Sequence, residues 1–379
     1  MSIHSITRIK PVTCTTKAYA LVLNTQPYGG GLWHTWFDRD LGLAGRVLLK
    51  GPDGEVQSRL VRIDEPVARL PNLSIHLTAG AERESFSPNL QEHGKALLTI
   101  SKDLMKLSAS DVENSEHTSR IHPLVLRMVA QKLGVSPADI EDVELQLIDV
   151  QPSCTGGADN EFVFSGRLDN LCSAYQSLRA LIDGSANDIA NQTNVRMAML
   201  FDHEECGSNS ISGAGSSLFM DTFKTIVQQF DPANHGTLMK TLGNSFVVSA
   251  DMAHGLHPNY SAKHDPTMAP IINGGMVIKH NANQRYATNA LSATMFRRFG
   301  KLANVPVQEF TVKADSACGS TIGPIISTLS GILTVDCGSP QFSMHSIREM
   351  MGTEDVYNGY AILLSTLENH PKVKSSVEF

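Results

Sequence analysis

The sequence lacks the features that mark several large protein classes. Its six cysteines lie far apart and form no CxxC pair, which argues against a zinc knuckle and a disulfide framework, so we expect reduced thiols. Lysine and arginine are dispersed and the net charge is -7, which gives no electrostatic footprint for nucleic acid. No apolar run is long enough to span a bilayer, and no signal-like segment follows Met1. These absences predict a cytoplasmic protein with small or peptidic substrates and without nucleic-acid or membrane partners.

The first part of the chain is predicted to be rich in β-structure. A length of 379 residues favours two domains. Alternating apolar residues and glycine-rich turns predict a mostly antiparallel sheet. Its strands are expected at residues 19–23, 45–49 and 60–63. Helical spacing at residues 121–130 and the Ser136–Pro137 pair, which is typical of a helix start, add a helical flank.

From residue 160 onward, strand and helix patterns alternate along the chain. Such alternation predicts an α/β domain with a mainly parallel central sheet. The expected strands are residues 162–164, 195–201 and 246–248, and the expected helices are residues 171–182 and 215–230. The sequence shows no internal repeat, no low-complexity tract and no long linker.

Acidic side chains follow the expected strands of this second part. Glu204 and Glu205 follow one strand, Asp251 follows another, and Asp169 follows a third. Ionised carboxylates are costly to desolvate unless they bind a cation or a proton. Ligands of open α/β sheets collect at the carboxyl ends of strands, so these groups are expected to converge in one crevice and hold a metal.

His345 supplies an imidazole to the same set of residues. It lies in a loop after the apolar segment 332–335. Asp, Glu and His side chains together suit zinc, and manganese and cobalt accept the same ligands. With one carboxylate that bridges, the set favours two metals rather than one.

Each of these residues also has an ordinary structural explanation. A single Asp after a strand is usually a turn residue or the N-cap of a helix. A pair of glutamates is common on exposed helices, although one that follows a buried strand is less easily explained in that way. His203, His254 and His257 could equally be core residues or partners of metal ligands. Spacing alone leaves these alternatives open.

Five segments closely resemble the aspartyl aminopeptidase family of zinc metallopeptidases, and the likeness extends over nearly the whole chain. They are residues 28–41, 167–171, 202–205, 249–260 and 344–349. The resemblance implies a cytosolic two-zinc exopeptidase that removes N-terminal Asp or Glu from peptides. It also implies an α/β catalytic domain interrupted by a β-rich dimerisation domain, and a homododecamer built from dimers.

The same resemblance implies domain bounds and an incomplete start. Residues 5–155 resemble the β-rich dimerisation domain with its helical flank, and residues 156–379 resemble the α/β zinc peptidase catalytic domain. Upstream of the region like residues 9–12, the family carries a motif whose histidine binds the second metal. Because this chain begins at Met1 in that place, we expect the N-terminal part of the catalytic domain to be absent and one metal site to be incomplete. His4 is out of register and is not expected to replace that ligand.

The resemblance also implies catalytic and metal-binding roles. Asp169 is similar to the carboxylate that bridges both metals. Glu205 and His345 are implied to complete one metal site, and Asp251 to belong to the other. Glu204 is similar to the general base. These roles agree with metal chemistry, because a metal lowers the pKa of water and a carboxylate can take its proton and return it to the leaving amine.

Four further residues are implied to bind substrate. Lys279 resembles the basic residue that meets the acidic N-terminal side chain, and Tyr286 lies in a matching segment. His254 lies within the matching segment 249–260, and His76 resembles a dimerisation-domain histidine that reaches a neighbouring subunit's active site. Without the resemblance, Lys279 would be interpreted as a solvated strand-end lysine and His76 as a strand surface residue.

Two functions follow from the sequence. The first is a metalloaminopeptidase that removes N-terminal Asp or Glu, with Glu204 as the general base. The alternative is a non-catalytic truncated isoform or assembly subunit that lacks the first metal-binding histidine. Hydrolysis of an N-terminal Asp peptide by the purified chain separates the two.

Overall fold

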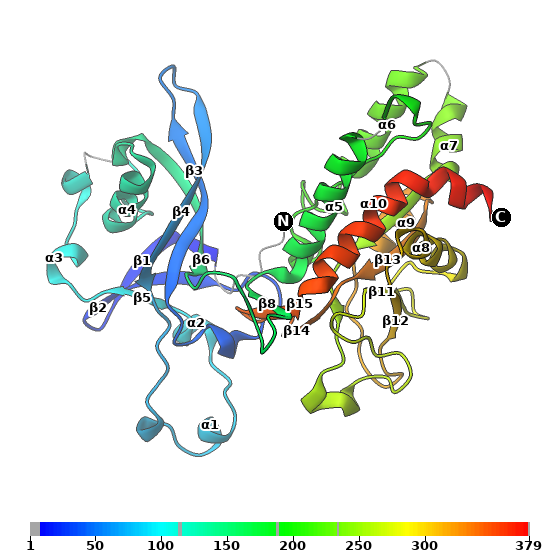
Figure 1. Ribbon diagram of the computed structural model, residues 1–379. Helices are drawn as coiled ribbons and strands as arrows, with labels where there is room; N and C mark the ends of the chain where they lie inside the picture. The colour runs from blue at the N-terminus through cyan, green and yellow to red at the C-terminus, as the bar shows by residue number, and fades with distance from the viewer. Residues whose placement is uncertain (1–7, 113–115, 187–188, 233–234, 378–379) are drawn as a thin grey trace. The chain divides into compact units, whose positions relative to one another are not determined.

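The computed structural model describes residues 8–112, 116–186, 189–232 and 235–377, and the chain divides into two compact units between Pro152 and Ser153 (Figure 1). The described residues form three sheets with helices packed on them, which confirms the predicted mixed α/β fold. His4 lies outside the described residues.

The unit that ends at Pro152 is built on one antiparallel sheet, as the alternating pattern predicted. Its six strands lie in the order β4-β3-β6-β1-β2-β5, and the buried side chains of Leu41, Leu43 and Val47 form part of its core. Burial of one face of each strand is what stabilises such a sheet. The strands are β1 (Arg8–Lys17), β2 (Ala20–Gln26), β3 (Leu41–Lys50), β4 (Val56–Ala68), β5 (Ala96–Thr99) and β6 (Ile140–Asp149).

One helix of this unit, α4 (Pro123–Leu133), packs on β4 and has signals at both ends. His122 caps its N-terminus, Pro123 occupies the first turn, and Gly134 ends it in a left-handed conformation. The helix predicted to open at Ser136 is wrong, because only the 3-10 turn Pro137–Asp139 forms before β6 begins. The short helices are α1 (Ala81–Glu84), α2 (Leu90–His93) and α3 (Lys102–Met105).

The unit that begins at Ser153 contains two sheets. One has the order β12-β11-β13-β9, in which β11 pairs in parallel with β12, β13 in parallel with β9, and β11 antiparallel with β13. The other has the order β10-β14-β15-β8-β7. The strands are β7 (Cys154–Gly156), β8 (Phe162–Ser165), β9 (Phe246–Ala250), β10 (Ala253–His254), β11 (Met276–His280), β12 (Val307–Thr311), β13 (Leu333–Gly338), β14 (Pro340–Phe342) and β15 (Glu349–Gly352).

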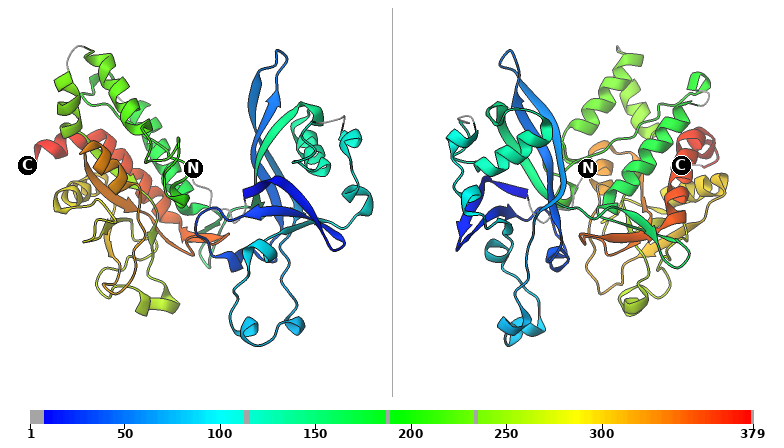
Figure 2. Two further views of the ribbon diagram at one scale, coloured as in Figure 1. Left: turned by 180° about the vertical axis from the view of Figure 1, so that it is seen from behind. Right: turned by 60° about the vertical axis from the view of Figure 1, so that its left-hand side comes forward.

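Helices cover these sheets, and the long C-terminal helix α10 packs against α5 and α8, as both views in Figure 2 show. Phe296 and Phe299 of α8 lie fully buried in the core with Val335 and Ile362. No helix in the described ranges is both long and apolar enough to cross a membrane. The helices are α5 (Leu168–Ala186), α6 (Leu218–Phe230), α7 (His235–Asn244), α8 (Ala290–Ala303), α9 (Gly323–Ser330) and α10 (Thr353–Ser375).

The strand predicted at residues 195–201 is wrong. Within the described chain this segment joins no sheet, although β9 is an edge strand. Residues 195–201 and β9 both line a cavity of about 670 Å³. An apolar run becomes a strand only when a neighbouring strand satisfies its backbone, and the described chain supplies none at this place.

We expect Phe296→Ala to destabilise the second unit by about 3–5 kcal/mol, because it removes a fully buried ring from the core and leaves a cavity. Chemical denaturation of the variant measures the loss. Phe230→Ala is the matched control, since Phe230 is also helical but 75% exposed, and it should change stability by less than about 0.5 kcal/mol. Equal losses in the two variants would contradict the packing described for α8.

Candidate metal centre

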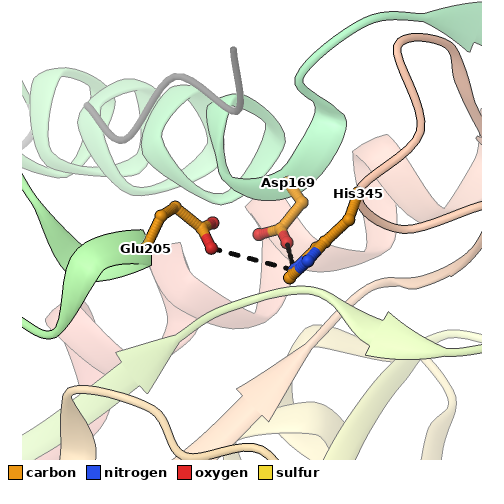
Figure 3. Close-up of side chains that lie close together, drawn as sticks. All are labelled: Asp169, Glu205 and His345. Carbon is orange, nitrogen blue, oxygen red and sulfur yellow. Dashed lines mark ion pairs between the residues drawn. The ribbon is translucent and has the colours of Figure 1, made fainter. Parts of the chain in front are cut away.

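Three side chains from separate parts of the second unit converge on one point (Figure 3). Asp169, Glu205 and His345 each offer a ligand atom, and these atoms lie within 4.8 Å of one another. The Nε2 atom of His345 lies 3.6 Å from Oδ2 of Asp169 and 3.8 Å from Oε2 of Glu205. Both carboxylates are almost fully buried, at 5% and 7% exposure. The three groups therefore form one compact cluster in which the two carboxylates are shielded from water and the imidazole is partly exposed.

The three positions are set by local turns. Asp169 lies at the start of α5, where its backbone is still extended before the helix proper begins. Glu205 lies in the 3-10 turn Glu204–Cys206, which is flanked by left-handed residues, including Gly207 at φ +106°. That conformation is accessible to glycine at little cost. His345 lies in the loop between β14 and β15 and is itself left-handed, at φ +70°.

The donor set and its spacing fit a zinc ion. Two carboxylate oxygens and one imidazole nitrogen are typical protein ligands of a catalytic zinc, which keeps a further position open. Ligand atoms about 2.0–2.2 Å from a tetrahedral zinc lie roughly 3.3–3.6 Å apart. The 3.6 and 3.8 Å separations at His345 are close to that range. Small side-chain movements are enough to bring the three atoms to one cation.

Glu204 adjoins the ligand candidate Glu205 in the chain and lines a cavity. It lines the cavity of about 670 Å³ together with Glu205 and Asp251. Most of the remaining cavity wall is apolar, and it includes the helix α6. A carboxylate that adjoins both a metal cluster and a cavity is placed to exchange protons with a molecule bound there.

Asp251 extends the cluster toward a buried cation. It interacts with Asp169, and its Oδ2 lies 3.3 Å from Nζ of Lys279, which is only 3% exposed. Burial alone would raise the pKa of Asp251, but the Lys279 ammonium and hydrogen bonds hold that pKa below its ordinary value. The predicted metal ligand Asp251 and the predicted substrate residue Lys279 are therefore neighbours.

The other predicted substrate residues have different surroundings. Nζ of Lys279 lies 5.4 Å from the ring centroid of Tyr286, which is buried, so the ammonium and the ring are close neighbours. His254 forms part of β10, and its ring packs edge-on against Phe310 at 5.8 Å. His76 belongs to the first unit, where it lies in the exposed 3-10 turn Ile75–Leu77 rather than on a strand.

Asp336 is a buried carboxylate that the sequence did not reveal as functional. It accepts hydrogen bonds from the Ala287 backbone N–H at 2.6 Å and the Thr321 hydroxyl at 2.7 Å. Burial raises its pKa above the ordinary range. Its contacts connect the segment that carries Tyr286 with the segment that carries Thr321. A Cβ at Gly323, the first residue of α9, would lie 2.1 Å from Oδ2 of Asp336.

Glu349 was also missed as a separate site residue. It begins β15, is 2% exposed and belongs to the segment 344–349 that carries His345. A glutamate at the start of a strand has no sequence signal that distinguishes a buried group from a solvated one. The only sequence indication of a role for Glu349 was its position, four residues after the candidate ligand His345.

Comparison with protein families gives one match over most of the chain. The family model described as aminopeptidase I zinc metalloprotease (M18) matches residues 5–366. A probable aspartyl aminopeptidase of Ricinus communis is 46% identical over an alignment 392 residues long, which includes 98% of this chain and 80% of that relative. An aspartyl aminopeptidase of Dictyostelium discoideum is 39% identical over an alignment 396 residues long, which includes 98% of this chain and 81% of that relative.

Solved structures show the same fold. The cryo-EM structure of the Ape4 and Nbr1 complex contains a chain with a TM-score of 0.93 and 38% identity, covering 100% of this chain and 73% of that one. The mApe1 dodecamer of Saccharomyces cerevisiae matches with a TM-score of 0.83 and 27% identity, covering 99% of this chain and 80% of that one. The chain thus shares its fold with both of these structures.

Proposed function

The chain belongs to the aminopeptidase I zinc metalloprotease (M18) family and is a metalloaminopeptidase, and from this premise we propose that it removes acidic residues from the N-termini of peptides. The observation that carries the proposal is the convergence of Asp169, Glu205 and His345, with Glu204 beside them at a cavity. The names of the relatives support the preference for aspartate.

The proposed ligands divide into two groups. Asp169, Glu205 and His345 would hold one zinc ion, and the spacing of their ligand atoms supports this assignment. Asp251, which interacts directly with Asp169, would belong to a second metal site. Zinc held in this way lowers the pKa of water and polarises a peptide carbonyl.

Glu204 is the proposed general base. Its carboxylate takes a proton from the attacking water and later gives one to the leaving amine, so that both transfers use the same group. Glu205, its neighbour in the chain, stays a ligand because its oxygen points toward His345. The two adjacent glutamates thus have separate tasks, which the 3-10 turn makes possible by directing them differently.

Lys279 is the proposed source of acidic specificity. Its ammonium is buried beside Tyr286 and pairs with Asp251, so a substrate carboxylate that reached it would meet a desolvated positive charge. Charge pairing of this kind favours Asp and Glu over neutral side chains. His254 forms another part of the proposed substrate site, since it lies close enough to Lys279 and Asp251 to interact electrostatically with both.

Self-assembly is the remaining part of the proposal. The first unit, with its antiparallel sheet, serves as the dimerisation domain and His76 as a contact to a neighbouring subunit's active site. The dodecameric relative supports a homododecamer. The alternative of a non-catalytic assembly subunit is not favoured, because the described chain brings three candidate ligands and Glu204 together.

Hydrolysis assays test this function. With zinc added, we expect the purified chain to cleave a dipeptide with N-terminal Asp at least about tenfold faster than one with N-terminal Leu, since charge selection of 1.4 kcal/mol gives that factor. A chelator should abolish the activity and zinc should restore it. An N-acetylated Asp dipeptide is the matched control and should not be cleaved. Equal cleavage of the acetylated peptide, or activity that survives the chelator, would refute the proposal.

A further inference from the structure

Glu349 connects the two chain segments that carry Asp169 and His345. One carboxylate oxygen accepts the backbone N–H of Asp169 at 2.9 Å, and the other accepts the backbone N–H of His345 at 2.8 Å. Glu349 is 2% exposed, and its bond to Asp169 is buried while its bond to His345 is partly buried. A single side chain therefore holds two candidate ligands that are 176 residues apart in the sequence, at positions 169 and 345.

The place of Glu349 in the sheet explains how it reaches both segments. At the start of β15 it pairs with Ser165 of β8, four positions before Asp169. His345 lies four positions before Glu349, in the loop that leads into β15. The β8–β15 ladder thus brings the two segments together, and the carboxylate fixes their spacing.

The two segments need such a support. His345 has φ +70° and Arg167, two residues before Asp169, has φ +59°. A left-handed conformation is unfavourable for a residue with a side chain. Hydrogen bonds from the backbones of Asp169 and His345 to the Glu349 side chain stabilise the conformations of both segments.

We propose that Glu349 is a positioning residue that fixes Asp169 and His345 at metal-binding distance. It binds no metal and touches no substrate, and it acts through the backbones of both ligands. The inference rests on the metal site of the proposed function, but it concerns metal affinity rather than the reaction or its substrate.

Zinc affinity tests this role directly. Glu349→Gln keeps the size of the side chain but replaces one acceptor oxygen with an NH2 group, which cannot accept a backbone N–H. We expect its zinc dissociation constant, measured by competition with a chromogenic chelator, to rise about 10- to 100-fold. Glu349→Asp, which keeps both acceptor oxygens on a shorter chain, should recover part of the affinity.

Asp355→Asn is the matched control. Asp355 is 1% exposed and likewise accepts two backbone N–H groups, from Asn273 and Gly275, in the same unit. It should lose stability without a comparable loss of zinc affinity. An equal loss in Asp355→Asn, or wild-type affinity in Glu349→Gln, would overturn the role. If Glu349→Gln fails to fold, Glu349→Asp measured against Asp355→Asn decides by the same criterion.

The two proposals fail in different assays. A wild-type chain that binds zinc, and loses it in His345→Ala, but cleaves no peptide would refute the proposed substrate while the affinity comparison still decides the role of Glu349. A wild-type chain that binds no zinc would overturn both.

Discussion

Glu204→Gln is expected to lower kcat for an N-terminal Asp peptide by about 10²–10⁴-fold, the usual contribution of a general acid or base. Glutamine has the same size and still accepts a hydrogen bond, but it cannot take a proton from water. The variant should bind as much zinc as the wild type, because Glu204 is outside the cluster of Asp169, Glu205 and His345. Steady-state kinetics with metal analysis of the same sample measures both quantities.

The control for this variant is Glu354→Gln, which makes the same chemical change at an exposed position in the first turn of α10. It should keep full activity. Loss of zinc together with activity in Glu204→Gln would show that Glu204 is a ligand and not the base. Activity near the wild-type level would mean that another group moves the proton.

The candidate metal centre was predicted from residue types, and the roles assigned to its residues stay predictions. Four acidic residues and His345 were selected because carboxylates that follow apolar segments need a cation, and the structure brings Asp169, Glu205 and His345 within 4.8 Å. Metal ligands come from a few residue types, so candidate ligands can be selected from the sequence alone. The distances between them were not predictable, because they depend on how segments 36 to 176 residues apart in the sequence fold together.

Elements whose signals lie within their own residues could be predicted from the sequence, and a strand also needs a partner. The helix α4 was predicted from the helical spacing of residues 121–130, and its ends are set by its own cap at His122 and its own stop at Gly134. The segment 195–201 has a strand's composition but no described partner, and it forms no strand. Whether a strand forms is decided by its neighbour, which sequence periodicity does not report.

The supporting carboxylates were missed for a related reason. Asp336 and Glu349 are buried, and each accepts backbone N–H groups from segments distant in sequence. A charged residue inside a strand is interpreted as solvent-facing unless the fold is known. Their burial becomes visible only after the strands are paired, since the pairing decides which face of each strand is covered.

Lys279→Met is expected to remove most of the preference for acidic N-termini. Methionine fills a similar volume but carries no charge, so a substrate carboxylate would meet an uncharged side chain beside Tyr286. Loss of one partner of a buried charge pair costs about 2–5 kcal/mol. We therefore expect the ratio of kcat/KM for Asp over Leu peptides to fall by about 10²-fold, with most of the change on the Asp peptide.

The variant also leaves Asp251 without its Lys279 partner, which separates two explanations for any loss of activity. If Lys279 binds substrate, zinc content stays at the wild-type level and cleavage of the Leu peptide continues. If Lys279 acts by holding Asp251, zinc content changes and cleavage of both peptides falls together. Lys313→Met, at a lysine only 4.0 Å from the exposed Asp315, makes the same change outside the pocket and should alter neither the ratio nor the zinc content.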